Sequence, residues 1–569
     1  MKGGAFMKIN RIIAGIMSLC LVCGATVIPE NISPFVPETV SAENYENISW
    51  TLKDGILTIS GTGDMPDYKT EYDSYILEYP EDDIRTTAPW SKDCLSITEV
   101  IVEDGITSIG NRAFYNCVNI TKVTMPESIK RIGNNAFGRC SSMSSVSIPD
   151  SVTDIGSGAF ANCKSIDSIV IPDGTTVIRQ STFSNCDSLT SITIPESVTT
   201  IEGNAVAGCD SLASIDIPEY VTDISYYALS GNKNLTDINV SQNNPNYSSE
   251  NGVLFNKDKT TLIMYSEGNK STSYTIPDTV TTVGISSFRY NKTIESIIMP
   301  DSVTTIEYRA FGECESLQSV KLSENLKNLG ELAFCQCESL ESVNIPSSLE
   351  NVENGAFYYC TGLESVNLPD NLKVLGENMF AYTGLTSVTI PKDITTISDG
   401  TFRNCKITSL DIPDNVKIIS GNAFSGCDFL TSVTVPENVE SIGSKAFAYC
   451  ENLEEVIILN PKCDIGPDKH TFSNSMDRFD VTICGYKNST ANSFSRGYGH
   501  NFKLITGTLS GDANGDGQFN IADLTIFRKF LLGSSDLKIS DWKYLDLCED
   551  GVLDAFDYCL MKKKLLENK

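Results

Sequence analysis

One 23-residue pattern recurs along most of this 569-residue chain. Three full copies read ITKVTMPESIKRIGNNAFGRCSS from residue 120, MSSVSIPDSVTDIGSGAFANCKS from residue 143 and LTSVTVPENVESIGSKAFAYCEN from residue 430. Copies begin at residues 97, 120, 143, 166, 189, 212, 235, 271, 294, 317, 340, 363, 385, 407, 430 and, in part, 453. Those at 363 and 385 have 22 residues, and the copy at 235 has 36 because it carries an insert. No copy can bury its apolar side alone, so the copies must stack on one another.

Each copy has two parts with different periods. The x-S-V-x-I part alternates with period two, and its β-branched residues predict a short strand. Proline follows this strand in twelve copies, from Pro126 to Pro436, because it cannot donate to a ladder. The A-F-x-x-C part predicts a short helical turn whose Phe faces the interior. The sequence therefore predicts a mixed α/β solenoid with one short strand and one helical turn per copy.

The array over residues 97–505 resembles the BspA-like class of bacterial leucine-rich repeats. Residues 43–96, with WTL and LTISGTG, resemble the hairpin segment that caps such arrays. An insert near residues 242–270 resembles a hairpin of the same class, and residues 484–504 resemble its closing cap. The resemblance implies adhesion or partner recognition, with a protein or a glycan as the ligand of the solenoid.

Cysteine fills one slot of the pattern in eleven copies, and Asn232, Asn291 and Thr383 fill it elsewhere. The eleven are Cys117, Cys140, Cys163, Cys186, Cys209, Cys314, Cys337, Cys360, Cys405, Cys427 and Cys450. A metal or redox ladder is the chemical alternative, but the array has no paired C-x-x-C ligands. A disulfide framework is disfavoured because the cysteines recur at one repeated position. We expect a column of buried free thiols, which implies an oxygen-poor habitat.

Residues 1–42 have the layout of a secretory signal peptide. Basic residues precede an apolar run from Ile12 to Ile28, and Val40-Ser41-Ala42 offers a cleavage site. A membrane anchor is the alternative, but the run is short for one and no second long apolar run follows. We therefore expect a secreted protein without membrane insertion. The formal net charge of −30 argues against nucleic-acid binding, which needs clustered basic residues.

Residues 512–523, DANGDGQFNIAD, have the spacing of a twelve-residue calcium loop. Gly517 permits the sharp turn, and an amphipathic helix follows at 524–532. The alternative is an ordinary surface turn rich in Asp and Asn. The spacing predicts one strong calcium site with oxygen ligands from Asp512, Asn514, Asp516, Gln518, Asn520 and Asp523.

A second, poorer copy of this loop begins 34 residues later. Cys548 stands at its third position, where soft sulfur is a poor ligand for calcium. A helix over residues 558–566 follows. The sequence predicts a degenerate calcium site formed by Asp546, Asp550, Val552, Asp554 and Asp557.

The two loop-helix copies resemble a type I-like dockerin, a small all-α calcium-binding module that binds the cohesin of a scaffold protein. The likeness covers residues 511–566, which makes 506–511 a linker and 512–569 the dockerin domain. The resemblance implies cohesin contacts from Ile521, Ala522, Arg528, Lys529, Ala555, Phe556, Lys562 and Lys563. Ile521-Ala522 and Ala555-Phe556 stand where dockerins of the Ser-Thr type carry serine and threonine. The resemblance therefore does not tell which group of cohesins the domain would bind. Ordinary packing between the two helices is the alternative role for these residues.

The resemblances imply a non-catalytic component of a cell-surface cellulosome in an anaerobic bacterium. Its dockerin would bind cohesin with calcium, and its solenoid would present a recognition surface. Alternatives are an accessory or hydrolytic component of plant-polysaccharide breakdown, or an inert acidic spacer. A glycoside hydrolase needs two carboxylates across a cleft, but the acidic residues here lie mostly at repeat positions. His470 and His500 have no G-x-S-x-G motif beside them. The outward strand positions carry almost no aromatic residues, which carbohydrate platforms usually need.

Overall fold

The computed structural model describes residues 47–70, 86–505, 511–513, 519–533, 545–548 and 552–567, together with the backbone of Val40 and Ser41. The predicted signal peptide lies outside the described residues except for those two. Within the described ranges, no helix is long and apolar enough to cross a membrane.

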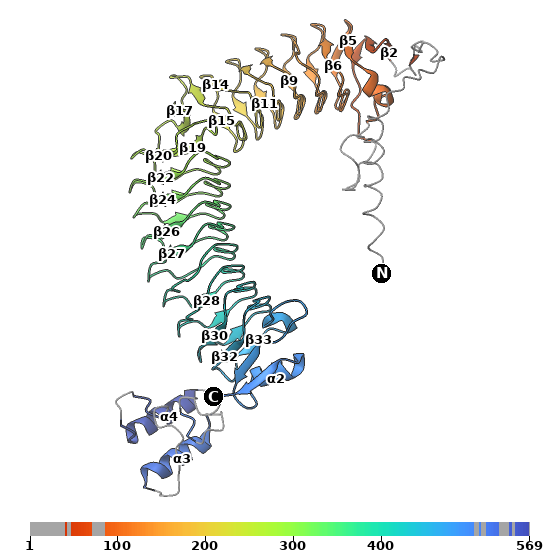
Figure 1. Cartoon of the computed structure of the whole chain (residues 1–569). Helices are drawn as coiled ribbons and strands as arrows, with labels where there is room; N and C mark the ends of the chain where they lie inside the picture. Colours follow the sequence, from red (N-terminus) through yellow and green to blue (C-terminus); the bar gives the residue numbers. More distant parts are fainter. Residues whose placement is uncertain are drawn as a thin grey trace, which may run out of the picture.

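The repeats stack into a curved rod, as Figure 1 shows. The predicted strand pairs in parallel with its equivalent in the next coil, so that Ser168 lies opposite Ser191. This first ladder confirms the repeat solenoid. Its strands are β5 (Glu99–Val102), β7 (Lys122–Thr124), β10 (Ser168–Val170), β12 (Ser191–Thr193), β14 (Ser214–Ile217), β16 (Asp237–Val240), β20 (Ser273–Thr275), β22 (Ser296–Ile298), β24 (Ser319–Lys321), β26 (Ser342–Asn344), β27 (Ser365–Asn367), β30 (Ser432–Val435) and β32 (Glu455–Ile458).

A second ladder of short strands, which we did not predict, runs along the V-x-x-I-G part of the coils. Strands of two residues carry no alternating signal, so periodicity could not reveal them. The ladder consists of β4 (Gly63–Asp64), β6 (Ile106–Ile109), β8 (Arg131–Ile132), β9 (Asp154–Ile155), β11 (Val177–Ile178), β13 (Thr200–Ile201), β15 (Asp223–Ile224), β21 (Thr282–Val283), β23 (Thr305–Ile306), β25 (Asn328–Leu329), β28 (Thr396–Ile397), β29 (Ile418–Ile419), β31 (Ser441–Ile442) and β33 (Asp464–Ile465).

The helical turn predicted for A-F-x-x-C is wrong, because these described segments form turns rather than helices. In the first coil, Asn116 has a φ of 65°, which no right-handed helix allows. The amides of Phe114 and Asn116 donate to carbonyls of the next coil, each over 2.8 Å. The amide of Cys117 instead bonds back to Phe114 within its own coil. This alternation makes a third ladder that ties each turn to its neighbour.

Both ends of the array are capped, and the insert adds strands in the middle. The N-terminal hairpin that we predicted is present as an antiparallel pair that leads into the first ladder. The insert contains three antiparallel strands rather than a single hairpin. The elements are β1 (Val40–Ser41), β2 (Ile48–Lys53), β3 (Ile56–Gly61) and the 3-10 helix η1 (Ser91–Ser96) at the start; β17 (Tyr247–Glu250), β18 (Val253–Asn256) and β19 (Thr261–Tyr265) in the insert; and η2 (Lys469–Thr471), β34 (Thr482–Gly485), α2 (Thr490–Tyr498) and β35 (Asn501–Leu504) at the close.

The core is built from a column of phenylalanines that stack face to face along the rod. Neighbouring rings such as Phe311 and Phe334 lie 4.8 Å apart with an interplanar angle of 2°. Val206 and Leu229 stand where Phe is expected, and the column stops there. It resumes at Tyr265. The apolar interior therefore consists of two clusters that meet at the insert.

The cysteine column lies beside the phenylalanines, and all eleven members are buried free thiols. Each thiol from the second copy onward faces the Phe carbonyl of an earlier coil, as Cys140 Sγ faces Phe114 O at 3.2 Å. Asn232 makes the same bond, because its Nδ2 donates to the Val206 carbonyl over 2.8 Å. The slot therefore selects a small side chain that can donate a hydrogen bond, and the column serves packing.

A small cavity marks the junction between the two clusters. It measures about 40 Å³, enough for one or a few waters, and its lining includes Ser230, Tyr265 and Ser287. Glu267 also lines it and accepts a hydrogen bond from the Gly231 amide. Burial raises the pKa of Glu267 to about 7.

Candidate functional site

The C-terminal region is helical, with α3 (Ile521–Leu531) and α4 (Ala555–Glu567) packed against each other. Phe527 and Met561 are fully buried in their small shared core. Each helix begins two residues before the end of one of the predicted calcium loops, so its first turn holds the last residue of that loop.

The first predicted loop is closed by the fully buried carboxylate of Asp523, in the first turn of α3. Its Oδ1 accepts from the Ala513 amide at 3.0 Å and its Oδ2 from the Asn520 amide at 2.7 Å. Asn520 caps the helix by accepting from the Ala522 amide at 2.8 Å, which completes a capping box. Asp512 is also buried. Asn514, Asp516 and Gln518 lie outside the described residues.

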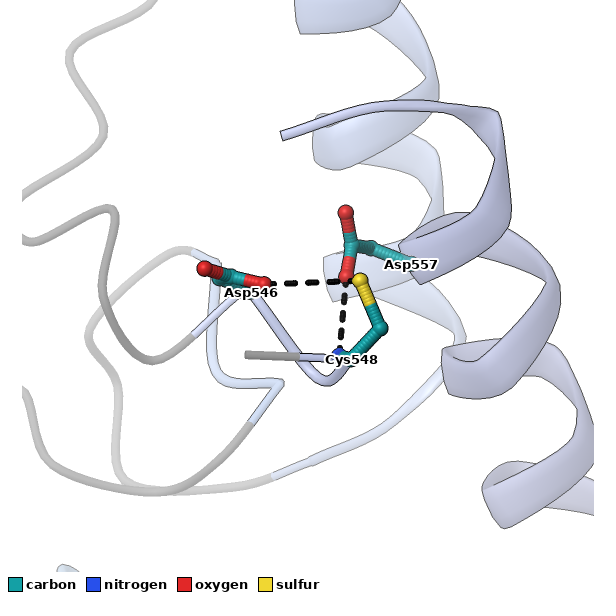
Figure 2. A group of neighbouring side chains, drawn as sticks. All are labelled: Asp546, Cys548 and Asp557. Atoms are coloured by element: carbon teal, nitrogen blue, oxygen red, sulfur yellow. Dashed lines mark hydrogen bonds between the residues drawn. The ribbon is translucent and has the colours of Figure 1, made fainter. Parts of the chain in front are cut away.

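The second loop has a similar arrangement, and Figure 2 shows three of its side chains, Asp546, Cys548 and Asp557. Asp557 Oδ1 accepts from the Cys548 amide at 3.2 Å, and its Oδ2 accepts from the Asp554 amide at 3.0 Å. The ligand atoms of Asp546, Cys548 and Asp557 lie within 4.8 Å of one another. Val552 is exposed, and Asp550 lies outside the described residues. The loop thus brings two carboxylates and a thiol together in one place.

The charge state of Asp557 suits a cation. Burial alone would raise the pKa of its carboxyl, but hydrogen bonds from the Asp554 and Cys548 amides and from the Cys548 thiol outweigh it. The pKa therefore lies below the ordinary range, and the carboxylate is ionised at neutral pH. Two carboxylates held this close fit a hard divalent cation that takes oxygen ligands.

Cys548 fits such a cation poorly. Its Sγ lies 3.6 Å from Asp546 Oδ1. In the sequence, Cys548 holds the loop position that Asn514 holds in the first loop. Sulfur is a soft donor and calcium prefers oxygen, so the thiol adds little to the oxygen donors of this loop.

The predicted contact residues all lie exposed on the two helices. Ile521 and Phe556, each in the first turn of its helix, are 68% and 61% exposed. The sequence analysis missed Leu532 and Leu566, two further exposed apolar side chains near the far ends of the helices. Their exposure depends on how the helices pack, which the residue pattern alone did not fix.

Two family models match the chain. The model for the BspA type leucine-rich repeat region matches residues 91–186, 153–259, 263–384 and 350–478. The chain belongs to the BspA-type leucine-rich repeat family. The model for the dockerin type I domain matches residues 510–566, so this family member also contains a dockerin domain. Neither model describes a catalytic domain.

The chain is also similar to solved structures of bacterial leucine-rich repeat proteins. A leucine rich cell surface protein from Faecalibacterium prausnitzii is 29% identical, and the match covers 61% of this chain and 95% of that one with a TM-score of 0.49. A leucine-rich repeat protein from Eubacterium ventriosum is 30% identical, with 66% and 96% covered and a TM-score of 0.45. One from Bacteroides ovatus is 21% identical, with 81% and 99% covered and a TM-score of 0.42. A comparison with curated proteins finds no match.

The two histidines lie in the closing cap among aromatic rings. His500 stacks on Phe494 at 5.5 Å, and its Nε2 lies 3.1 Å from the Lys469 carbonyl. Burial lowers the pKa of His500. His470 contacts the rings of Tyr449 and Phe479. Both side chains therefore pack the cap.

Proposed function

We propose that this protein is a secreted, non-catalytic component of a cellulosome. Its dockerin binds a cohesin of the scaffold protein in the presence of calcium, and its solenoid presents a surface for protein or glycan recognition. The observation that carries the proposal is the dockerin match over residues 510–566, together with the two loops closed by Asp523 and Asp557. The signal-peptide pattern of residues 1–42 supports export, and the column of free thiols supports an anaerobic habitat.

In this proposal, oxygen ligands hold calcium in both loops, and the first loop holds it more tightly. Calcium, when bound, supplies the charge that lets several carboxylates share one small loop. The proposed ligands are Asp512, Asn514, Asp516, Gln518, Asn520 and Asp523 in the first loop, and Asp546, Asp550, Val552, Asp554 and Asp557 in the second. Asp523 and Asp557 also tie their loops to the helices through backbone amides, so they couple ion binding to the position of α3 and α4.

The proposed cohesin surface combines exposed apolar and basic side chains on the two helices. Ile521 and Phe556 supply apolar anchors at equivalent places, and Arg528, Lys529, Lys562 and Lys563 steer the encounter with an acidic partner. Ala522 and Ala555 complete the proposed set, each beside an anchor.

A cohesin panel tests this function directly. We expect the full-length mature protein to bind at least one cohesin in calcium and none in EDTA. Asp523→Asn should weaken calcium binding by about tenfold or more, because it removes a charged ligand that also closes the loop. Asp370→Asn is the matched control, since Asp370 is an exposed carboxylate in the solenoid. Calcium-independent binding, or no binding to any cohesin, would overturn the proposal.

A further inference from the structure

Three tyrosines from two neighbouring coils form a cluster on the turn edge of the rod, in which Tyr359 is exposed and the other two are half-buried. Tyr358 and Tyr359 follow the core residue Phe357, and Tyr382 holds the same slot as Tyr359 in the next coil. The ring centroids of Tyr358 and Tyr359 each lie 5.6 Å from that of Tyr382. The sequence analysis concerned aromatic residues on the strand face, and it did not predict this cluster on the turn edge.

Tyrosine fills this turn position in four coils, although the backbone there has the left-handed conformation. The residue before the cysteine column has a positive φ in fourteen coils, a conformation that favours glycine and asparagine. Asn or Gly fills seven of these positions: Asn116, Asn162, Asn185, Asn404, Gly208, Gly231 and Gly426. Tyr359 and Tyr382 adopt it with φ of 62° and 61°. Tyr290 and Tyr449 adopt the same conformation, so what sets Tyr359 and Tyr382 apart is that they stand in neighbouring coils with ring centroids 5.6 Å apart.

A hollow of about 270 Å³ opens beside the cluster. Tyr358 and Tyr382 form part of its wall, and Arg403 lies over the Tyr382 ring with its guanidinium carbon 5.6 Å from the centroid. The exposed carboxylates of Glu331 and Glu377 line the hollow as well. The volume is near the lower end for small-ligand sites.

The lining chemistry favours a neutral ligand with apolar faces and hydroxyl edges. A cationic peptide would meet Arg403, and an anionic ligand would meet Glu331 and Glu377. A sugar ring avoids both conflicts, because its C–H faces can lie against the tyrosines. Its hydroxyls can donate to the carboxylates and accept from the guanidinium.

We propose that this hollow, the tyrosine hollow, is a binding subsite for a neutral polysaccharide and engages one or two sugar rings through Tyr358 and Tyr382. The inference rests on the proposed function in one respect, that the solenoid presents a recognition surface. It names the place on that surface and the class of ligand.

Affinity electrophoresis of the full-length mature protein tests the tyrosine hollow. The probes are soluble mixed-linkage β-glucan, arabinoxylan and galactomannan, with polygalacturonate and polylysine as charged comparisons. The variant Tyr358→Ser/Tyr382→Asn installs residues that other coils carry at these slots, such as Ser425 and Asn404. It therefore removes the rings while keeping the turns. Tyr449→Asn is the control, at the same slot three coils away.

We expect at least one neutral polysaccharide to retard the wild type, and the double variant to lose affinity by about tenfold or more. Tyr449→Asn should bind as the wild type does. The proposal is overturned if no neutral polysaccharide binds, if the double variant still binds, or if only the charged polymers bind. Cohesin capture with calcium on the same preparation separates the two hypotheses. Capture without retardation refutes the tyrosine hollow alone, and retardation without capture refutes the docking function alone.

Discussion

Cys548 is the residue that most distinguishes the two calcium loops. Its thiol stands beside the carboxylates of Asp546 and Asp557, where an oxygen would complete the set. We predict that Cys548→Asp strengthens calcium binding by the second loop by about tenfold or more, because a hard ligand replaces a soft one. Calorimetric titration of the full chain measures this. Cys559→Asp, on the exposed surface of α4, should leave the titration unchanged. An unchanged affinity in Cys548→Asp would mean that the thiol does not face the ion.

The thiols of the cysteine column should be inert in the folded protein. Burial raises the pKa of Cys163 to about 12, so almost none of it is thiolate at neutral pH. We predict that a thiol reagent modifies exposed Cys559 in the native protein and the column only after denaturation. Counting the thiols that react with the reagent under anaerobic conditions, with and without denaturant, checks this. A denatured protein with most of its thiols already oxidised would contradict it.

At the scale of elements, the insert and its cavity place a titrating group inside the rod. Arg289 forms an ion pair with Glu313 at 2.6 Å. Its positive charge therefore lowers the pKa of Glu267 only slightly, and burial raises that pKa by more. The pKa of Glu267 rises from 4.5 to about 7 on folding. Between these values the folded state holds more protons than the unfolded state, so the free energy of unfolding falls as pH rises.

We predict that Glu267→Gln removes this pH dependence. It should stabilise the protein above pH 7 by up to roughly 3 kcal/mol, because the neutral amide still accepts from the Gly231 amide. Urea unfolding of both proteins from pH 4.5 to pH 8 measures the difference. Glu364→Gln, on an exposed side chain, should follow the wild type. Equal pH profiles for wild type and Glu267→Gln would refute the prediction.

Sequence reasoning recovered the elements that repeat a residue pattern and missed those set by hydrogen bonding between coils. The strand from Ser168 to Val170 could be predicted because its side chains alternate. The turn around Phe114 could not be predicted, because its backbone hydrogen bonds go to the next coil. The A-F-x-x-C residues on their own are equally compatible with a helical turn. The same limit applies to the candidate site: spacing located Asp523 and Asp557, but not the amides that hold them.

The shortened copies show how such a deletion is absorbed. Along the sequence, Thr383 and Leu385 are one residue closer to each other than the equivalent Cys360 and Leu363. The segment that leads from the turn to the next strand of the first ladder is therefore one residue shorter. In the described chain the first ladder lapses between β27 and β30, whereas the second ladder continues through β28 and β29. The first ladder also lapses between β7 and β10, in a copy of full length, so the short link accompanies the lapse without being its only cause.

For the whole molecule, the two core clusters predict that the rod unfolds in two parts. Phe334 lies fully buried in the second cluster, and its replacement by Ala removes a ring from the stack. We predict that Phe334→Ala destabilises that part by about 3–5 kcal/mol. Amide hydrogen exchange should speed up between residues 288 and 447 and remain unchanged between 100 and 200, because each coil depends on its neighbours.

Phe160→Ala is the matched control, since Phe160 occupies the equivalent place in the first cluster. It should accelerate exchange in the first part alone. Equal acceleration along the whole rod in either variant would show that the insert does not divide the core.

The direction of the turn ladder gives the closing cap a second role, because the last turns need acceptors beyond the repeats. Each turn donates its alternate amides forward, and the last turns find their acceptors in the closing cap, where Phe447 and Cys450 donate to Thr471 and Ser473. A rod cut before this cap would present a row of open donors to solvent. The closing cap therefore supplies the acceptors that keep this edge of the rod from pairing with the backbone of another chain.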